Sequence, residues 1–421
     1  MDAMTTVPPV RFDPASQDFA RHAYEHYAGL REESPVHRLL RPDGSELWLI
    51  TRYQDARAAL ADPRLSRDPH SARSAPDETG APPIFLRLTA GRMMVSEPPE
   101  HTRLRRFAGH VWTPRRIQRL RPMIEAVTQT LLDRMAKEEE VDLLSAFAFP
   151  LAITVICELG GVPVADRPLI RRWAGLMESN DPEPGSLIPL WEQTFVQYAA
   201  ELVRVTASDH RDDLADDEQP DLLHALLGAT EGEDRLSHDE IADMLVLLLN
   251  AGHETTANLI GNGMLALLRH PDQRELLRRH PELLPNAVEE LLRYDGPADR
   301  AALRFSLEPL TVGGVTIPAH RMVLVLLASA DHDPDQFEDP ERLDIARPRP
   351  QHLGFGHGIH LCPGAPLARL VAEIAFGGLL ARFPDLELAC PIDEVRFRTA
   401  GYHLRGLCSL PVRLHAKVRA G

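Results

Sequence analysis

The chain has 421 residues, of which 62 are acidic and 46 are lysine or arginine, giving a formal net charge of −16. An acidic balance of this size argues against nucleic acid as a partner. The four cysteines are scattered through the sequence, which argues against a disulfide framework and for a reducing compartment. The apolar stretches are too short for a signal peptide or a membrane anchor, so we expect a soluble, cytoplasmic protein.

Apolar residues at helical spacing dominate the chain, and strand-like segments are short. We expect long helices near residues 118–137, 143–160, 190–207, 237–270 and 364–382. Strand patterns lie at residues 47–51, 309–317 (with a Gly313-Gly314 turn) and 321–327, and polar stretches at 66–91 and 209–220 are typical of loops. Without internal repeats, this order predicts one mainly α domain with small β-sheets at one side, over residues 1–421 with a core at about 12–414.

Cationic side chains occur early in the chain, in the run His101-Thr102-Arg103-Leu104-Arg105. On a helix His101 and Arg105 share one face, because residues at i and i+4 are neighbours. Such a face is either a solvated surface or a site for an anionic group.

The segment from Ser237 to His270 predicts the longest helix of the chain. Ser237 and Glu240 form a capping-box signature at its start. At roughly 1.5 Å per residue this helix would be about 50 Å long, enough to cross the whole domain.

The centre of this helix carries polar groups in apolar surroundings, in the run Ala251-Gly252-His253-Glu254-Thr255-Thr256. Small residues there would let a flat group approach, and Thr255 can hydrogen-bond back to the carbonyl of Ala251. An acid beside a hydroxyl in an apolar helix costs free energy unless it is solvated or used. The alternative to a functional site is that these six residues only form a polar kink in a core helix. We interpret His253 as a packing or surface histidine, because it points about 100° away from its neighbours.

Cys362 is the most informative residue, because of the run Phe355-Gly356-His357-Gly358-Ile359-His360-Leu361-Cys362-Pro363-Gly364. The glycines suggest a backbone pressed against something large and flat, and the helical pattern of residues 364–382 follows directly. A thiolate at a helix N-terminus is stabilised by the helix dipole and by free N–H groups, so it can hold iron. The alternative of a small buried cysteine suits the other three cysteines better.

This run resembles the haem-binding loop of cytochrome P450 enzymes, with Phe355, Gly358, Cys362 and Gly364 at its four fixed places. The resemblance covers about residues 12–414 and is closest to soluble bacterial members that act on polyketide-type substrates. It implies a cytochrome P450-type fold with a long central helix crossing the haem, and haem b with Cys362 as its axial ligand. The implied activity is a monooxygenase that inserts one oxygen atom from O2 into a C–H or C=C bond. One departure is Pro363, which follows the ligand directly and has no N–H.

The resemblance also assigns roles to residues elsewhere in the chain. Glu254 and Thr255 align with the family's acid–alcohol pair, so Thr255 would hold water and hydrogen-bond dioxygen while Glu254 relays protons. The haem propionates would be bound by His101, Arg105, Arg304 and His360. Glu290 and Arg293 share a helical face and resemble the family's Glu-x-x-Arg element, with Arg342 as the third member of a structural network behind the Cys362 loop.

Electrons must come from outside the chain, because the sequence has no Gly-x-Gly-x-x-Gly run after a strand and no cysteine cluster for an iron–sulfur centre. We therefore expect electrons from NAD(P)H to arrive through a ferredoxin and its ferredoxin reductase. A predicted basic patch suits an acidic partner, although it could serve only solubility. Its members are Arg103, Arg106, Arg115, Arg116, Arg119 and Arg121. We expect a monomer.

The predicted substrate pocket mixes apolar and polar groups, which favours a large, partly oxygenated lipophile such as a macrolide or terpenoid; a steroid fits almost as well. Its expected residues are Met93, Met94, Val95, Leu248, Ala251, Ala298 and Tyr402. A haem-binding sensor or carrier without catalysis is the alternative outside the enzymes. The Glu254–Thr255 pair argues against it, because a sensor needs no proton relay. Among enzymes, a peroxide-using or ring-coupling member is the narrower alternative.

Overall fold

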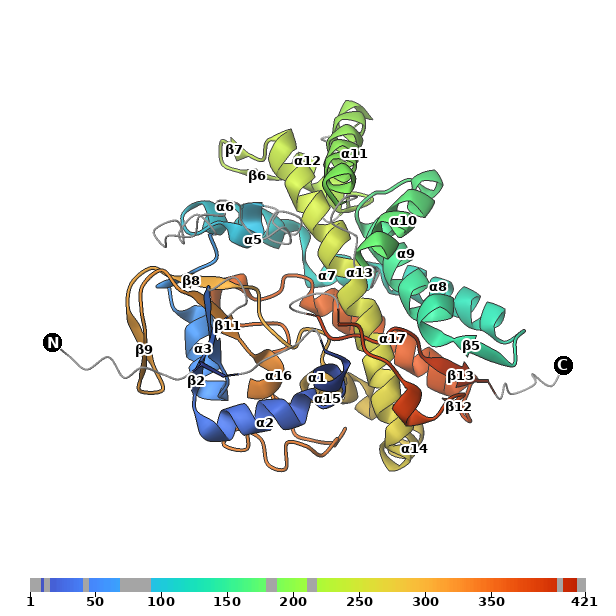
Figure 1. Ribbon diagram of the computed structural model, residues 1–421. Helices are drawn as coiled ribbons and strands as arrows, with labels where there is room; N and C mark the ends of the chain where they lie inside the picture. The colour runs from blue at the N-terminus through green and yellow to red at the C-terminus, as the bar shows by residue number, and fades with distance from the viewer. Residues whose placement is uncertain are drawn as a thin grey trace.

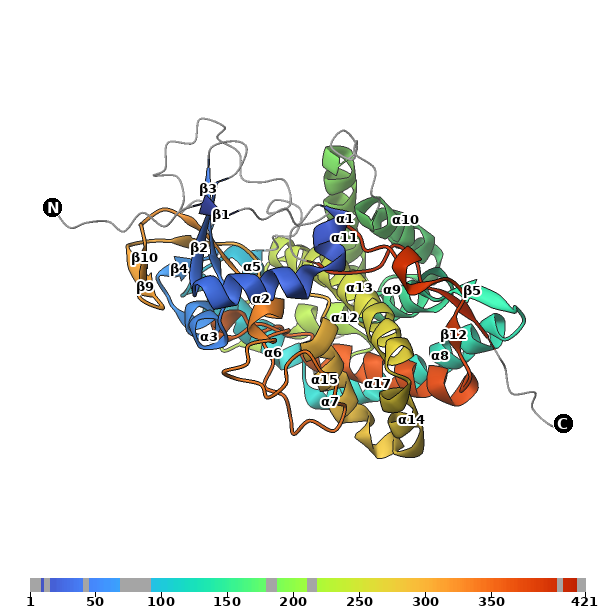
Figure 2. The same ribbon diagram turned by 60° about the horizontal axis from the view of Figure 1, so that its bottom comes forward.

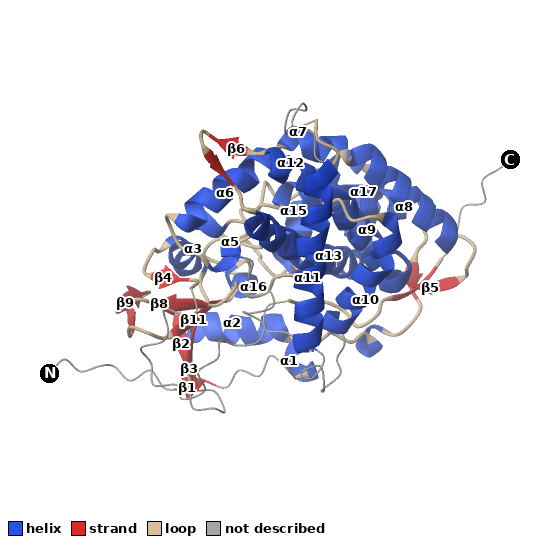
Figure 3. Cartoon of the chain, turned by 90° about the horizontal axis from the view of Figure 1, so that it is seen from above, coloured by secondary structure: helices blue, strands red, loops and turns tan. Residues whose placement is uncertain are grey.

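The computed structural model describes residues 9–10, 16–40, 45–68, 92–178, 188–209, 218–399 and 404–414. Helices make up most of this part of the chain, and the largest sheet lies at one side of the helical body while β5 (Glu140–Asp142) lies at the opposite side (Figure 1 and Figure 3). The predicted mainly α fold with small β-sheets is confirmed, but the sheets are not all at one side. The helices are α1 (Gln17–Arg21), α2 (Ala23–Glu33), α3 (Tyr53–Ala61), α5 (Arg92–Val95), α6 (Glu100–Val111), α7 (Pro114–Arg119), α8 (Arg121–Met135), α9 (Phe149–Leu159), α10 (Arg167–Glu178), α11 (Ile188–Asp209), α12 (Leu222–Gly228), α13 (His238–Arg269), α14 (Pro271–Arg279), α15 (Leu284–Asp295), α16 (Leu327–Ala330) and α17 (Ala365–Arg382).

Helix α13 runs through the middle of the molecule (Figure 1). Its 32 residues span about 48 Å at roughly 1.5 Å per residue. The predicted capping box is present: the N–H of Glu240 donates to Ser237 Oγ over 3.2 Å, and the N–H of Ser237 donates to Glu240 Oε2 over 2.8 Å. Because α13 packs against α9, α11, α15 and α17, it forms the axis of the largest apolar core.

The largest sheet has the strand order β1-β2-β3-β11-β8-β4. Its strands are β1 (Pro9–Val10), β2 (Val36–Leu40), β3 (Glu46–Ile50), β4 (Leu65–Ser66), β8 (Arg304–Ser306) and β11 (Met322–Val325). The smaller sheets contain β5 (Glu140–Asp142), β6 (Thr230–Glu231), β7 (Asp234–Arg235), β9 (Leu310–Val312), β10 (Val315–Ile317), β12 (Glu387–Leu388) and β13 (Pro411–Arg413). Val323 pairs with Trp48 on one side and with Arg304 on the other, so the sheet fixes the backbone position of Arg304.

The predicted strands are present, with ends that differ from the prediction by one or two residues. Residues 47–51 correspond to β3, and residues 309–317 form the β9–β10 hairpin around Gly313 and Gly314, both in the left-handed region. The pattern at 321–327 ends as a strand at Val325, because Leu326 and Leu327 already accept helical hydrogen bonds from Ala330 and Asp331.

Two predicted helices are each divided in the structure. Residues 118–137 belong to two helices, since α7 ends at Arg119 and α8 begins at Arg121, directly before a proline. Residues 143–160 start with one π-helical segment (Leu144–Ala148) and continue as α9, whose second residue is Pro150. Most of the two predicted loops, 66–91 and 209–220, lies outside the described residues.

Helices α13, α15 and α17 contact one another pairwise (Figure 2). The loop that carries Cys362 leads directly into α17, and the polar centre of α13 lines the same cavity as this loop. This three-helix contact therefore sets the position of the loop relative to Glu254 and Thr255.

Candidate active site

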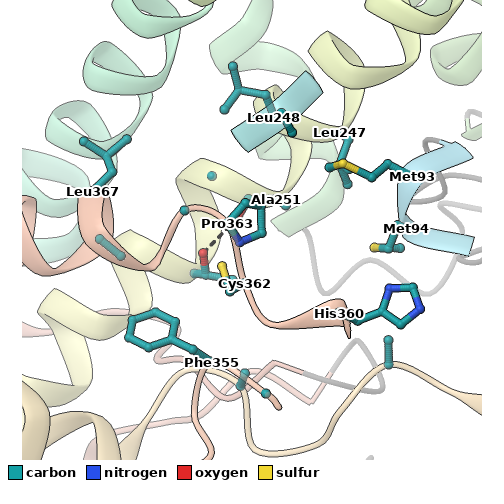
Figure 4. Close-up of a pocket in the computed structure, with 18 of the residues that line it drawn as sticks. Met93, Met94, Leu247, Leu248, Ala251, Phe355, His360, Cys362, Pro363 and Leu367 are labelled. Carbon is teal, nitrogen blue, oxygen red and sulfur yellow. Dashed lines mark hydrogen bonds between the residues drawn. The ribbon is translucent and has the colours of Figure 1, made fainter. Parts of the chain in front are cut away.

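A cavity of about 340 Å³ lies between the centre of α13 and the loop before α17. Helices α5 and α6 and the segment around Ala298 contribute further walls. Cys362 and Pro363 of this loop line the cavity together with Ala251 of α13, and Met93 and Met94 lie at one side of them (Figure 4). The sequence motifs at 251–256 and 355–364 thus meet at one site.

The Cys362 loop has a backbone that depends on glycine. Gly356 and Gly358 have φ values of 75° and 77°, in the region that side chains rarely adopt. A Cβ on Gly358 would also lie 2.7 Å from the carbonyl oxygen of Leu60. The N–H of Cys362 donates to the Phe355 carbonyl over 3.0 Å and closes the loop just before α17 begins at Ala365.

Burial raises the pKa of the Cys362 thiol, and several groups oppose this effect. The N–H groups of Gly364 and Ala365 hydrogen-bond the sulfur, and the charges of Arg105 and Arg369 act in the same direction. Pro363 has no N–H, so the donors come from the two residues after it. By contrast, burial raises the pKa of Cys157 to about 12. Cys362 therefore has the surroundings that a metal-bound thiolate needs, and Cys157 lacks them.

The four side chains expected at the haem propionates come together at one edge of the cavity, and Arg67 joins them. The rings of His101 and His360 lie 4.3 Å apart between centroids, and Arg105 donates to the Leu361 carbonyl over 2.6 Å. Burial and the nearby cations Arg67, His101, Arg304 and Arg105 lower the pKa of His360 to about 2. Sequence reasoning missed Arg67, which no local motif distinguishes.

Three buried atoms of this edge have no hydrogen-bond partner within the described part of the chain. They are His101 Nδ1, His360 Nε2 and Arg304 Nε. Burial lowers the pKa of Arg67 to about 9 and that of Arg304 to about 10, and Glu97 is the acidic side chain that counters both. A group with two carboxylates would supply the missing acceptors and the missing negative charge. The residues therefore fit haem: the cations at this edge would hold its propionates, and the Cys362 thiolate would hold its iron.

The centre of α13 has the local hydrogen bond that the sequence predicts. Thr255 Oγ1 donates to the Ala251 carbonyl over 2.8 Å, and Thr256 Oγ1 donates to the Gly252 carbonyl over 2.9 Å. The expectation about small residues needs one correction. Ala251 faces the cavity, but a Cβ on Gly252 would collide with Ile156 of α9, so Gly252 is also small because two helices approach closely there.

Glu254 is engaged by Arg398, which comes from the C-terminal part of the chain. Arg398 Nη1 lies 3.1 Å from Glu254 Oε1, and Arg398 Nη2 donates to Asn258 Oδ1 one turn further along α13. Burial raises the pKa of Glu254, and the charge of Arg398 opposes this effect. His253 is buried and its Nδ1 bonds the Leu249 carbonyl over 2.8 Å, as expected for a packing histidine.

Most of the expected substrate residues line the cavity. Met93, Met94, Leu248, Ala251 and Ala298 do so. Val95 is not among the lining residues, and Tyr402 lies outside the described residues.

The structural network behind the loop is present, but its third member is Arg347 and not Arg342. Arg293 donates to both carboxylate oxygens of Glu290 over 2.8 Å, and Arg347 lies 3.2 Å from the same carboxylate. Arg342 is exposed and contributes only its carbonyl, which accepts from Arg293 and Arg347. The prediction failed because the turn at Asp339–Arg342 directs this side chain to solvent.

The predicted basic patch is smaller than the sequence indicates. Arg103 pairs with Asp234 and Glu240 near the start of α13, and Arg106 lies 3.4 Å from Glu231. Arg116 is buried and donates to the carbonyls of Gln219 and Asp221. Arg115 and Arg119 remain exposed on α7.

Comparison with known proteins agrees with this geometry. Residues 180–391 match the family model described as Cytochrome P450. The chain is 45% identical to Cytochrome P450 107B1 of Saccharopolyspora erythraea over 96% of each chain. It is 44% identical to the cytochrome P450 monooxygenase PikC of Streptomyces venezuelae, over 99% of this chain and 97% of that one. The solved structure of the Bacillus subtilis 168 bacillaene polyketide synthase cytochrome P450 PksS superposes with a TM-score of 0.87 at 38% identity, covering 97% of this chain and 100% of that one. Within the described residues, no helix has the length and apolarity needed to cross a membrane.

Proposed function

We propose that this chain, which belongs to the cytochrome P450 family and is a haem-thiolate monooxygenase, oxidises a C–H or C=C bond of a lipophilic polyketide-type metabolite. The observation that carries the proposal is the shared cavity, which is lined both by Cys362, just before α17, and by Ala251 and Thr255 of α13. The substrate class rests on the relatives, since PksS is named for a polyketide synthase. The sensor alternative is not favoured, because PikC is named a monooxygenase.

Haem, when bound, supplies the activation of dioxygen. Cys362 would hold its iron through the thiolate, and His101, Arg105, Arg304 and His360, together with Arg67, would hold its propionates. Phe355 and Gly364 flank the ligand loop. The apolar walls at Met93, Leu248 and Ala298 would hold a lipophile and exclude water.

Inserting one oxygen atom and reducing the other to water consumes protons, which must cross α13. Burial raises the pKa of the Glu254 carboxyl, so this group binds a proton more readily than an exposed carboxyl does, which suits it to relay protons. The Arg398 contact would hold this carboxylate at the edge of the helix. Thr255 would give up its bond to the Ala251 carbonyl when its hydroxyl orients oxygen or water in the cavity.

Electrons would arrive from NAD(P)H through a ferredoxin and a ferredoxin reductase. The exposed arginines of α7, Arg115 and Arg119, would give this partner its docking surface. We also propose that the chain forms a single domain and acts as a monomer.

The test is spectroscopic and chemical. Haem-loaded protein, reduced and treated with carbon monoxide, should show the absorption band of thiolate-ligated haem, and Cys362→Ala should abolish it while Cys157→Ala retains it. With a ferredoxin, its reductase and isotopically labelled O2, a macrolide substrate should gain one labelled oxygen atom. A normal band from Cys362→Ala, or oxidation without label, would overturn the proposal.

A further inference from the structure

Arg300 is a buried cation in the wall of the active-site cavity. It lies on the segment between α15 and β8 that also contributes Ala298, Ala301 and Ala302 to the lining. Its side chain is 4% exposed. A charged donor at this depth is costly in a site that otherwise suits a lipophile, so its surroundings must compensate it.

The compensation is incomplete. Arg300 Nε donates to Asp299 Oδ1 over 3.0 Å, and the other oxygen of Asp299 accepts from the Tyr27 hydroxyl over 3.0 Å. Asp299 therefore balances the charge through one nitrogen of the guanidinium. Arg300 Nη1 is buried and has no hydrogen-bond partner within the described residues. A buried donor without an acceptor carries a desolvation penalty that a suitable ligand atom would remove.

Arg300 is separate from the cationic edge that fits the propionates. The cations that act on His360 are Arg67, Arg105 and Arg304, together with His101, whereas Arg300 interacts with Asp299, Tyr27 and Arg405. Arg405 in turn pairs with Asp295 over 2.6 Å. Haem propionates therefore do not account for the open donor of Arg300.

The charge balance selects the kind of acceptor. Asp299 already neutralises Arg300, so a ligand carboxylate would bring an unbalanced charge into a buried site and lose its hydration. A neutral carbonyl oxygen loses much less hydration and still accepts a charge-assisted hydrogen bond. We propose that Arg300 determines specificity by donating from Nη1 to a ketone, ester or lactone carbonyl of the substrate. The inference rests on the proposed function, because it names a recognition group on the substrate of that same site.

Matched ring compounds test this proposal: cyclopentadecanone, the hydrocarbon cyclopentadecane, and the open-chain pentadecanoic acid as an anionic probe. Affinity is measured on haem-loaded protein by the optical shift that follows water displacement, and independently by the shift in thermal midpoint. We expect the ketone to bind at least about tenfold more tightly than the hydrocarbon, the range for one hydrogen bond to a charged group. The acid should bind more weakly than the ketone.

Two variants change the donor without leaving an unpaired buried charge. Arg300→Met combined with Asp299→Asn removes both charges and the Nη1 donor, and Arg300→Lys keeps a cation beside Asp299 but replaces the guanidinium fork with an ammonium group. The double variant should reduce the ratio of ketone to hydrocarbon affinity to near one, and Arg300→Lys should reduce this ratio to a smaller extent. Leu247→Ala, on the α13 wall of the same cavity, should change both affinities together and leave the ratio intact.

An unchanged ratio in both Arg300 variants would overturn the proposal, and so would a preference for the acid over the ketone in the unaltered protein. The carbon monoxide band of each variant shows that the haem site is intact. If the unaltered protein lacks that band, the proposed function fails, while the thermal shifts still report whether Arg300 selects the ketone.

Discussion

Single residues in this chain differ in function because of their neighbours and not because of their type. Burial raises the pKa of both Cys362 and Cys157. Only Cys362 also lines the cavity, follows a glycine-dependent loop and receives N–H groups from the start of α17. A bound metal ion deprotonates a coordinating thiol, so we base the proposal that Cys362 is the ligand on its position and not on its pKa.

The acid–alcohol pair gives the first residue-scale prediction. Thr255→Ala should keep haem and substrate binding but release reducing equivalents as peroxide, because the hydroxyl no longer orients oxygen or water. Glu254→Gln should slow product formation about a hundredfold, the range of general acid catalysis. Product, peroxide and NAD(P)H consumption are measured together. Thr256→Ala, whose hydroxyl bonds the next carbonyl of the same turn, is the matched control. If the ratio of product formed to NAD(P)H consumed is unchanged in both test variants, the proposed proton relay is contradicted.

The contact between Glu254 and Arg398 predicts a pH effect. Burial raises the pKa of Glu254 while Arg398 lowers it, so Arg398→Met should raise this pKa further. Because Glu254 then keeps its proton to higher pH, the alkaline fall in coupled turnover should move to higher pH. Arg398→Lys should restore the original pH profile of coupled turnover, and Glu254→Gln should abolish the alkaline fall in that profile. A profile that stays in place in Arg398→Met would show that the ion pair does not set the proton affinity of Glu254.

At the scale of elements, the close approach of α13 and α17 connects the helix that carries Glu254 and Thr255 to the helix that follows Cys362. A Cβ on Gly263 of α13 would lie 2.5 Å from the ring of the fully buried Phe376 of α17. Gly263→Ala should therefore lower the free energy of unfolding by about 1–3 kcal/mol, the cost of overpacking a core. Urea unfolding measures this change.

Gly29→Ala is the control for this prediction, because a Cβ on Gly29 in α2 meets no atom within 4 Å. Alanine at an open helical position should stabilise by up to about 1 kcal/mol. Combining Gly263→Ala with Phe376→Leu should recover part of the loss. Equal effects at Gly29 and Gly263 would mean that helix propensity, and not the contact between α13 and α17, controls this position.

The elements also show what sequence reasoning could reach. The capping box at Ser237 and the Thr255 bond to Ala251 depend on residues three or four apart, so spacing predicts them. The division of residues 118–137 into α7 and α8 was missed, although Pro122 was visible in the sequence. Arg347 was missed for a different reason: it meets Glu290 across 57 positions of the chain, and such a contact depends on the complete fold.

At the scale of the molecule, the residues that sequence reasoning missed are cations brought in from distant segments. Arg67 reaches the propionate edge from the end of β4, and Arg398 reaches α13 from a segment 144 positions beyond Glu254. Nothing in the immediate sequence of either arginine marks it, because its role depends on which buried groups the fold places beside it. The fold class and the ligand loop, by contrast, follow from patterns within short segments.

The distribution of charge over the whole molecule gives the last prediction. A protein with a net charge of −16 should repel an acidic ferredoxin except where basic side chains face it. Turnover with a ferredoxin should therefore fall as salt rises, since exposed charges are screened beyond about 8 Å at physiological ionic strength. Arg119→Glu should raise the KM for ferredoxin and leave substrate affinity unchanged. Arg116→Glu should instead lower the thermal midpoint, because its guanidinium is buried against the carbonyls of Gln219 and Asp221. Equal effects of the two changes on the KM for ferredoxin, with no loss of stability in Arg116→Glu, would show that the buried and exposed arginines of α7 act alike.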